Sequence, residues 1–321
     1  MNIGSMTGYQ KLTVITAVAT LVLIGVGALV RTTGSGLGCP DWPLCHGQII
    51  PPAEKTAIIE YSHRTLAMVV GFLIMGTAWV TLRSHSDDRP ARMLAIISLP
   101  LLFVQAWLGK VTVERELPAE AVMIHLGTAL TLLAILAVIA AFSILGSGRR
   151  RVESAERASV LRIAHIATIV TAGVLMIGAY TVGSHAGVAC TSWPGCAEGS
   201  IPFVDGGRLQ HIHWIHRITV VAGLAAIGVL AMAATNMRER VPALERAVWA
   251  ALALYGLQIA IGALNIWSDF AEIVLVAHLA VGSAIWALLV LILVVGRFEF
   301  ETDRAAYTTD TLRTPAADPG A

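Results

Sequence analysis

The chain has 321 residues, of which 56% are hydrophobic and 13% charged, about half the charged share of a soluble globular domain. Its 22 Lys and Arg residues nearly balance its 21 Asp and Glu residues, which leaves a net charge of +1. This composition argues against a water-soluble fold, against a nucleic-acid-binding protein with its basic surplus, and against an acidic disordered chain.

Eight apolar blocks without Asp, Glu, Lys or Arg follow one another along the chain. Each is near or above the roughly 18 residues that a bilayer helix needs, although the fifth block is expected to run on past its helix. The blocks are 12–30, 65–82, 93–109, 121–148, 163–197, 218–237, 247–268 and 273–296. The first block lacks a basic n-region and a small-residue cleavage site, which favours a retained helix. We therefore expect an all-α integral membrane protein with eight transmembrane helices.

The distribution of Lys and Arg predicts the orientation of these helices. Of the 22 basic residues, 15 lie at the termini or in the loops after the second, fourth and sixth helices. Basic residues concentrate on the cytoplasmic side of membrane proteins. Both termini are therefore predicted to be cytoplasmic, and the two long loops, 31–60 and 183–212, to lie outside.

The chain repeats itself at an offset of about 150 residues. The pattern C-x-x-W-P-x-C occurs at Cys39–Cys45 and again 151 residues later at Cys190–Cys196. Other pairs lie 153 residues apart: His63-Arg64 with His216-Arg217, Gln105 to Gly109 with Gln258 to Gly262, and His125 with His278. The repeat predicts two tandem four-helix bundles, 1–150 and 151–298. Because each has an even number of spans, a pseudo-twofold axis along the membrane normal should relate them. Residues 299–321 are expected to form a disordered cytoplasmic tail.

Four histidines occupy matched positions in the first turns of the even-numbered helices. They are His63 and His125 in the first half, and His216 and His278 in the second. An ionisable residue inside a membrane segment indicates function by default. Two imidazoles on facing helices suit the two faces of a haem better than a zinc site, which wants four ligands. The alternative is that each histidine only hydrogen-bonds a neighbouring helix.

Charged residues beside these histidines distinguish the two halves. Arg64 and Arg217 are placed to pair with haem propionates, or else to snorkel at the interface. Glu60 lies three residues before His63 on the same helix face, whereas the matching position before His216 is His213. A carboxylate there can relay protons, so the first half is predicted to do the chemistry. The alternative is a first-turn acid that complements the helix dipole.

All four cysteines fall in the two predicted outer loops. An oxidising compartment favours disulfides between Cys39 and Cys45 and between Cys190 and Cys196. A redox-active pair is the alternative.

The chain resembles the bacterial haem A synthase family. The resemblance rests on the eight spans in two halves, the sequence Glu60-Tyr-Ser-His63-Arg64, the matched histidines and the cysteine pair in each outer loop, and it covers residues 12–296. It implies oxidation of the C8 methyl group of haem O to a formyl group, which yields haem A for terminal cytochrome oxidase in the bacterial cell membrane.

The resemblance also implies roles for individual residues. His216 and His278 would ligate a haem b cofactor, His63 and His125 would flank the iron of the substrate haem O, and Glu60 would be catalytic. The Cys39 and Cys45 pair would take part in substrate handling. The expected partners are a haem O synthase, an electron carrier and cytochrome oxidase, with no nucleic acid; a homo-oligomer is possible. The alternative functions are a di-haem b electron-transfer cytochrome and a non-catalytic haem carrier.

Overall fold

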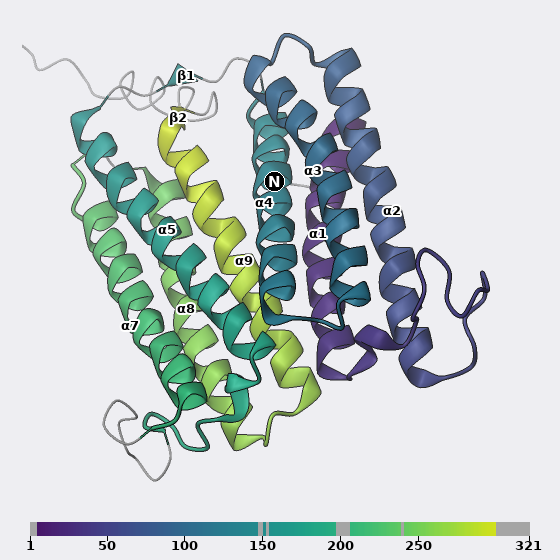
Figure 1. The fold of residues 1–321 in the computed structure, drawn as a ribbon. Coiled ribbons are helices and arrows are strands. Elements are labelled where there is room, and N and C mark those ends of the chain that lie inside the picture. The colour runs from purple at the N-terminus through teal and green to yellow at the C-terminus, as the bar shows by residue number, and fades with distance from the viewer. Residues whose placement is uncertain (1–4, 147–149, 152–153, 197–205, 239–240, 300–321) are drawn as a thin grey trace, which may run out of the picture.

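Eight long helices make up most of the described structure, a computed structural model that describes residues 5–146, 150–151, 154–196, 206–238 and 241–299 (Figure 1). In chain order they are α1 (Gly8–Thr32), α2 (Lys55–Ser84), α3 (Arg89–Glu114), α4 (Ala119–Leu145), α5 (Ala155–Gly183), α7 (Arg208–Thr235), α8 (Pro242–Trp267) and α9 (Glu272–Arg297). Each is long and apolar enough to cross a membrane. The predicted all-α membrane fold with eight spans is confirmed.

Local sequence signals explain where several helices begin. Thr7 caps α1 in a capping box with Gln10, and the side chains of Asp88 and Ser154 cap α3 and α5. Such side chains satisfy backbone N–H groups that the first turn leaves free. The fifth apolar block does run past its helix, since α5 ends at Gly183. Both predicted outer loops overlap a helix: residues 55–60 form the first turns of α2, and residues 208–212 begin α7. Glu60 therefore lies on the same helix as His63, as their spacing predicted.

The turns after α3 and α8 repeat the same unusual backbone. Glu116 and Leu117 both have positive φ, and so do Asp269 and Phe270, 153 residues later. In each turn the second residue donates its backbone N–H to a carbonyl of the last helical turn, Leu117 to Thr112 and Phe270 to Asn265. These bonds satisfy carbonyls that the helix end leaves free. The duplication therefore extends to the turns.

The helices of each half form a closed set of neighbours. Helix α1 packs on α2 and α4, and α3 packs on α2 and α4; α5, α7, α8 and α9 repeat this order. The halves meet where α1 contacts α9 and α4 contacts α5 and α9. Across this interface the indole N–H of Trp286 donates to the carbonyl of Leu130 at 2.9 Å. The twofold relation of the halves along a membrane normal stays a prediction.

Large apolar side chains remain on the outer surface of the bundle. Examples on four different helices are Phe72, Phe103, Ile169 and Val221, each more than 60% exposed. Water would oppose such exposure, whereas lipid tails accept it. This distribution is that of a multi-pass membrane protein.

The connections sort to the two ends of the bundle. The loops between α1 and α2 and between α5 and α7 lie at the same end, while β1 (Arg150–Arg151) and β2 (Phe298–Glu299) pair antiparallel at the other (Figure 1). The backbone of Glu299 therefore belongs to a strand, although it was predicted to begin the disordered tail. The rest of that tail, 300–321, lies outside the described residues.

Candidate functional site

Each of the four predicted histidines packs its imidazole against a glycine of the preceding helix of its half. A methyl group on that glycine would come within 3.0 to 3.3 Å of Cε1 of the ring, which is too close for ordinary contact. The pairs are His63 with Gly27, His125 with Gly109, His216 with Gly178 and His278 with Gly262. The missing side chain of the glycine lets the Cε1 edge of the ring approach the neighbouring helix, so this packing limits where the imidazoles can lie.

The imidazoles of each half lie close together. His63 and His125 are near enough to interact electrostatically, and so are His216 and His278. The Nδ1 atoms of His63, His125 and His216 are buried and have no hydrogen-bond partner within the described part of the chain. A buried polar atom without a partner is costly unless a ligand completes it. Both imidazoles of the first half, and that of His216 in the second, therefore have a ring nitrogen that a ligand could complete.

A glutamine accompanies one histidine of each pair. The side-chain nitrogen of Gln105 lies 3.3 Å from Nε2 of His125, and that of Gln258 lies 3.2 Å from Nδ1 of His278. The nitrogen of Gln258 also donates to the backbone carbonyl of His278 at 2.8 Å. These contacts come from α3 to α4 and from α8 to α9, so the duplication includes the residues that orient the rings.

The donor set fits a flat metal cofactor with two axial ligands. Among the described residues, no group of three or more His, Cys, Asp or Glu side chains is placed to hold a metal ion. A structural zinc site is therefore disfavoured in this part of the chain, because it would need four ligands near one point. Two neighbouring imidazoles within an apolar helix bundle suit haem iron. His63 with His125, and His216 with His278, are the residues that would hold it.

Both predicted disulfides are present in the loops at this end of the bundle. Cys39 is bonded to Cys45 and Cys190 to Cys196, and all four side chains are buried. Participation of the Cys39–Cys45 pair in substrate handling stays a prediction, with a redox-active pair as the alternative.

Arg64 ties the first disulfide loop to α2. Its Nη1 donates to the carbonyls of Asp41 and Leu44 at 2.5 and 2.8 Å, and its Nη2 donates to the carbonyl of Cys39 at 2.8 Å. Nη2 also forms an ion pair with Oε1 of Glu60 at 2.5 Å. The predicted propionate contact of Arg64 is untested, but in this structure both terminal nitrogens are occupied by the loop and Glu60.

Glu60 lies beneath the same loop and is only 3% exposed. Its Oε2 accepts the backbone N–H of Cys39 at 2.8 Å, so its two oxygens bridge the loop and Arg64. At the matching position of the second half, Nδ1 of His213 lies 3.0 Å from the carbonyl of Ala186. The carboxylate predicted to be catalytic is thus also a structural support of the loop.

Arg217 differs from Arg64 in how many of its terminal nitrogens form hydrogen bonds. Its Nη1 donates to the carbonyls of Ser192, Pro194 and Gly195 in the second disulfide loop. Its Nη2 is buried without a hydrogen-bond partner in the described residues, because the position of Glu60 is taken by His213. This nitrogen is available to an anionic group such as a propionate.

Asp41 closes a turn within the first disulfide loop, outside the helices. Its carboxylate accepts the backbone N–H groups of His46 at 2.6 Å and Gly47 at 2.8 Å. These bonds, led by that of Gly47 and assisted by the nearby charge of Arg64, hold the pKa of the Asp41 carboxyl below its ordinary value. Since the ionised form makes the bonds, the loop depends on that charge.

Comparison with known proteins places the chain in a family. A family model described as cytochrome oxidase assembly protein (COX15-CtaA) matches residues 10–290. The chain belongs to this family. It is 30% identical over 261 residues to the haem A synthase of an Exiguobacterium species (strain AT1b), covering 80% of this chain and 83% of the relative. It is 32% identical over 260 residues to that of Symbiobacterium thermophilum, with coverage of 78% and 82%.

A third relative extends the match to the Bacillus genus. The haem A synthase of Bacillus licheniformis is 29% identical over 236 residues, which cover 72% of this chain and 78% of the relative. The resemblance noted from the sequence is therefore confirmed at the level of the family.

The glycines that contact the imidazoles were not predicted from the sequence. Gly109 and Gly262 stand out in it only as the last residues of a repeat, and Gly27 and Gly178 carry no motif. A signal was available, because Gly27 and Gly178 are 151 residues apart, the offset of the cysteine loops. What the offset could not reveal was that these glycines touch histidines on the next helix.

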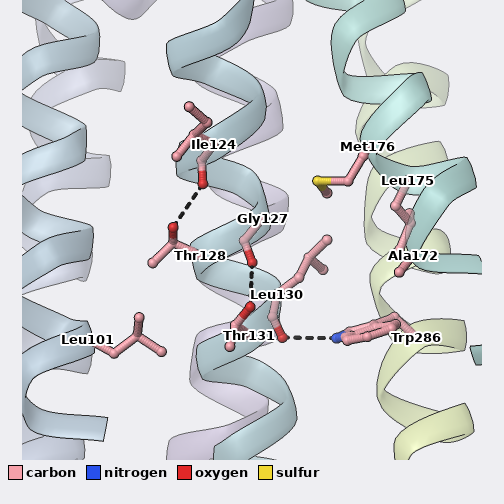
Figure 2. A pocket seen from close by; sticks show the side chains of 10 residues that line it. All are labelled: Leu101, Ile124, Gly127, Thr128, Leu130, Thr131, Ala172, Leu175, Met176 and Trp286. Carbon is pink, nitrogen blue, oxygen red and sulfur yellow. Dashed lines mark hydrogen bonds between the residues drawn. The ribbon is translucent and has the colours of Figure 1, made fainter. Parts of the chain in front are cut away.

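A further cavity of about 420 Å³ lies between the halves, away from the four glycines. Figure 2 shows Thr128 and Thr131 of α4 on one side, and Met176 of α5 and Trp286 of α9 on the other. The threonine hydroxyls donate to carbonyls of their own helix, so the cavity is largely apolar and suits a hydrocarbon chain.

Proposed function

We propose that this chain is a haem A synthase of a bacterial membrane, which oxidises the C8 methyl group of haem O to the formyl group of haem A. The observation that carries the proposal is the pair of imidazoles cradled by glycines in each half, in a chain of the cytochrome oxidase assembly family. The named haem A synthases cover the same span of sequence, which supports the assignment.

The two halves take different haems in this proposal. His216 and His278 hold a resident haem b, while His63 and His125 flank the iron of the substrate haem O. Two differences between the halves support this division. Only the first half has a carboxylate, Glu60, within one turn of its histidine. Of the two matched arginines, Arg217 and not Arg64 keeps a buried terminal nitrogen without a partner in the described residues, which a propionate could take.

The reaction proceeds by two successive hydroxylations of the methyl carbon in this scheme. Each replaces a C–H bond by a C–O bond: the carbon loses two electrons, and dioxygen takes these and two more from the electron carrier, so that with two protons it yields the new hydroxyl group and one water molecule. The resulting geminal diol loses water to leave the aldehyde. A bound haem b would pass electrons between the electron carrier and the site of the reaction. The helices around the imidazoles orient the substrate and exclude water.

Glu60 assists proton transfer from the substrate in the proposal, and its contacts couple that role to the disulfide loop. Both of its oxygens are engaged, Oε1 by Arg64 and Oε2 by the N–H of Cys39. Each oxygen keeps a second lone pair that can take a proton. Protonation would remove the charge that pairs with Arg64 and so weaken the support of the Cys39–Cys45 loop, which links the disulfide loop to substrate handling.

The proposal includes the membrane topology and the partners. Both termini are cytoplasmic, the disulfide loops face outside, a haem O synthase supplies the substrate, an electron carrier exchanges electrons, and cytochrome oxidase receives the product. The excess of Lys and Arg at the termini and in the loops after even-numbered spans supports this topology.

A di-haem electron-transfer cytochrome is the second candidate, because the matched histidine cradles of the two halves would serve two equivalent haems. Purified protein is supplied with haem O and a reductant under air, and extracted pigments are identified by mass. Formation of haem A supports the synthase. Protein that binds two haem b and leaves haem O unchanged would overturn the synthase.

Variants separate the roles of the two halves. His216→Ala should lose the absorption spectrum of the resident haem, whereas His63→Ala should keep that spectrum and lose haem A formation. Glu60→Gln keeps a side chain of similar shape and should retain the haem but lose product or stop at a hydroxylated intermediate. Wild-type turnover by Glu60→Gln would remove it from the chemistry.

A further inference from the structure

A second cavity of about 610 Å³ lies between α5 and α9, at the end of the bundle beside β1 and β2. The basic residues Arg162, His165 and Arg297 line it, together with Leu161 and Leu293. Among the described residues that line the cavity, none is acidic. It therefore joins concentrated positive charge to an apolar wall, near the start of α5 and the end of α9, the end of the bundle predicted to be cytoplasmic.

The positive groups of this cavity are not neutralised by the described part of the protein. In the described part of the chain the side-chain ion pairs are Arg64 with Glu60 and Lys110 with Glu114. Neither pair involves Arg162 or Arg297. Nδ1 of His165 hydrogen-bonds the Leu161 carbonyl at 2.7 Å, which leaves Nε2 for another contact. Two arginines that line one cavity supply the charge and the hydrogen-bond donors that a phosphate needs.

One face of α5 connects this cavity to the apolar cavity between the halves. Residues 162, 165, 169, 172 and 176 are spaced by three or four, so they form a single stripe on the helix. Ala172 and Met176, at the far end of that stripe, line the apolar cavity of Figure 2, and Ile169 between the two cavities is 70% exposed. On α9, Trp286, Leu293 and Arg297 form the equivalent stripe.

The length of this path corresponds to one leaflet. A helix rises about 1.5 Å per residue, so Arg162 and Ala172 are separated by about 15 Å along α5. Half of a hydrocarbon core of about 30 Å has the same depth. A headgroup held at Arg162 would thus have its acyl chain alongside Ile169 and reaching Ala172.

We propose that this groove binds an anionic phospholipid, with its phosphate between Arg162 and Arg297 and one acyl chain along the α5 stripe into the apolar cavity. Basic cavities between transmembrane helices on the cytoplasmic side bind anionic headgroups in this manner. The lipid joins α5 and α9 to α4, since all three line the apolar cavity, and so stabilises the contact between the halves.

The duplication provides a matched control. At the offsets of the repeat, Arg162 corresponds to Lys11, His165 to Val14 and Arg297 to Ile144. The first half has therefore one exposed cation where the second half has three basic groups. A general attraction of anionic lipid to the basic side of the protein would involve Lys11 as well, whereas the proposed site would not.

The experiment is native mass spectrometry of the purified full-length protein in detergent, with equal amounts of dioleoyl phosphatidylglycerol and dioleoyl phosphatidylcholine. The wild type should retain phosphatidylglycerol preferentially. An arginine near a lipid phosphate contributes about fivefold to affinity, so Arg162→Ala with Arg297→Ala should lower retention about 25-fold. Lys11→Ala should stay within about twofold of wild type, and lysine at both arginine positions should keep most of the preference.

Further arms separate a lipid site from a phosphate site. Millimolar inorganic phosphate should not displace the lipid, and Ala172→Trp, which fills the apolar cavity, should weaken dioleoyl phosphatidylglycerol but not its dihexanoyl analogue. Equal retention of both headgroups by wild type, an unchanged preference in the double alanine variant, or the same loss in Lys11→Ala would each overturn the proposal. Displacement by inorganic phosphate would show a free-anion site and overturn the lipid assignment.

Discussion

Gly178→Ala tests whether the contact with this glycine sets the position of His216, the proposed haem ligand. A methyl group at Gly178 would lie 3.0 Å from Cε1 of His216, and ordinary contact begins at 3.4 Å. The imidazole must therefore retreat by about 0.4 Å, which exceeds the tolerance of about 0.2 Å on metal–ligand distances. We expect the variant to lose or weaken ligation by His216.

The same substitution at other glycines gives graded controls. At Gly262 the methyl group would lie 3.3 Å from Cε1 of His278, so that ring needs to move by only about 0.1 Å. At Gly173, also on α5, a methyl group would meet nothing within 4 Å. Replacing a helical glycine by alanine otherwise stabilises by up to about 1 kcal/mol, whereas overpacking costs about 1–3 kcal/mol.

The assay combines the absorption spectrum of the resident haem with thermal unfolding of the purified variants. Gly173→Ala should match wild type in spectrum and melt at the same or a higher temperature. Gly178→Ala should show a shifted or diminished haem band and a lower melting temperature, with a net loss of up to about 2 kcal/mol in the free energy of unfolding. Gly262→Ala should lie between Gly173→Ala and Gly178→Ala in both measurements. An unaltered spectrum and melting temperature in Gly178→Ala would refute the idea that the glycine positions the ring.

Further predictions concern the first disulfide loop. Arg64→Ala leaves the buried carboxylate of Glu60 without its ion-pair partner, which should lower the free energy of unfolding by on the order of 3–5 kcal/mol. Adding Glu60→Gln removes the unpaired charge and should recover part of this loss in thermal unfolding. No recovery would count against the buried pair. The pKa of Asp41 is lowered in the folded protein, chiefly by the hydrogen bond from the N–H of Gly47. The ionised carboxylate therefore stabilises the loop fully above the ordinary pKa of aspartate, and this stabilisation is lost as the pH falls through the lower pKa of the folded protein. Hydrogen exchange of the loop, corrected for intrinsic rates, should show this acid dependence in wild type and not in Asp41→Asn. Thiol labelling of unreduced protein should modify none of the four cysteines; labelling of all four would contradict the disulfides.

The membrane fold was predictable because each span is a local property of the chain. A helix in lipid must satisfy its own backbone hydrogen bonds and present apolar side chains, so hydropathy alone marks it. For the same reason the boundaries were less certain: residues 55–60 are polar enough to resemble a loop, yet they form the first turns of α2. Contacts with Cys39 and Arg64 stabilise that end, and hydropathy does not register them.

The candidate site was predictable as far as its residue types repeat. The matched histidines, arginines and cysteines follow from the duplication, and both disulfides formed as expected. The partners of Arg64 were not predictable, because an arginine beside a histidine at a membrane edge reads equally as a propionate ligand or an interface anchor. Its actual contacts are carbonyls of a loop about 20 residues earlier in the chain.

The sequence by itself determined the number of spans, the duplication and the identity of the titratable residues inside the membrane, since all of these are written in local composition and in a constant offset. Only the tertiary structure decided that Gly27, Gly109, Gly178 and Gly262 hold the four imidazoles, that Glu60 supports a disulfide loop, and that Arg162 and Arg297 share a cavity. Each of these facts depends on which helix faces which. That choice is made by the packing of whole surfaces, and no single segment of the chain contains it.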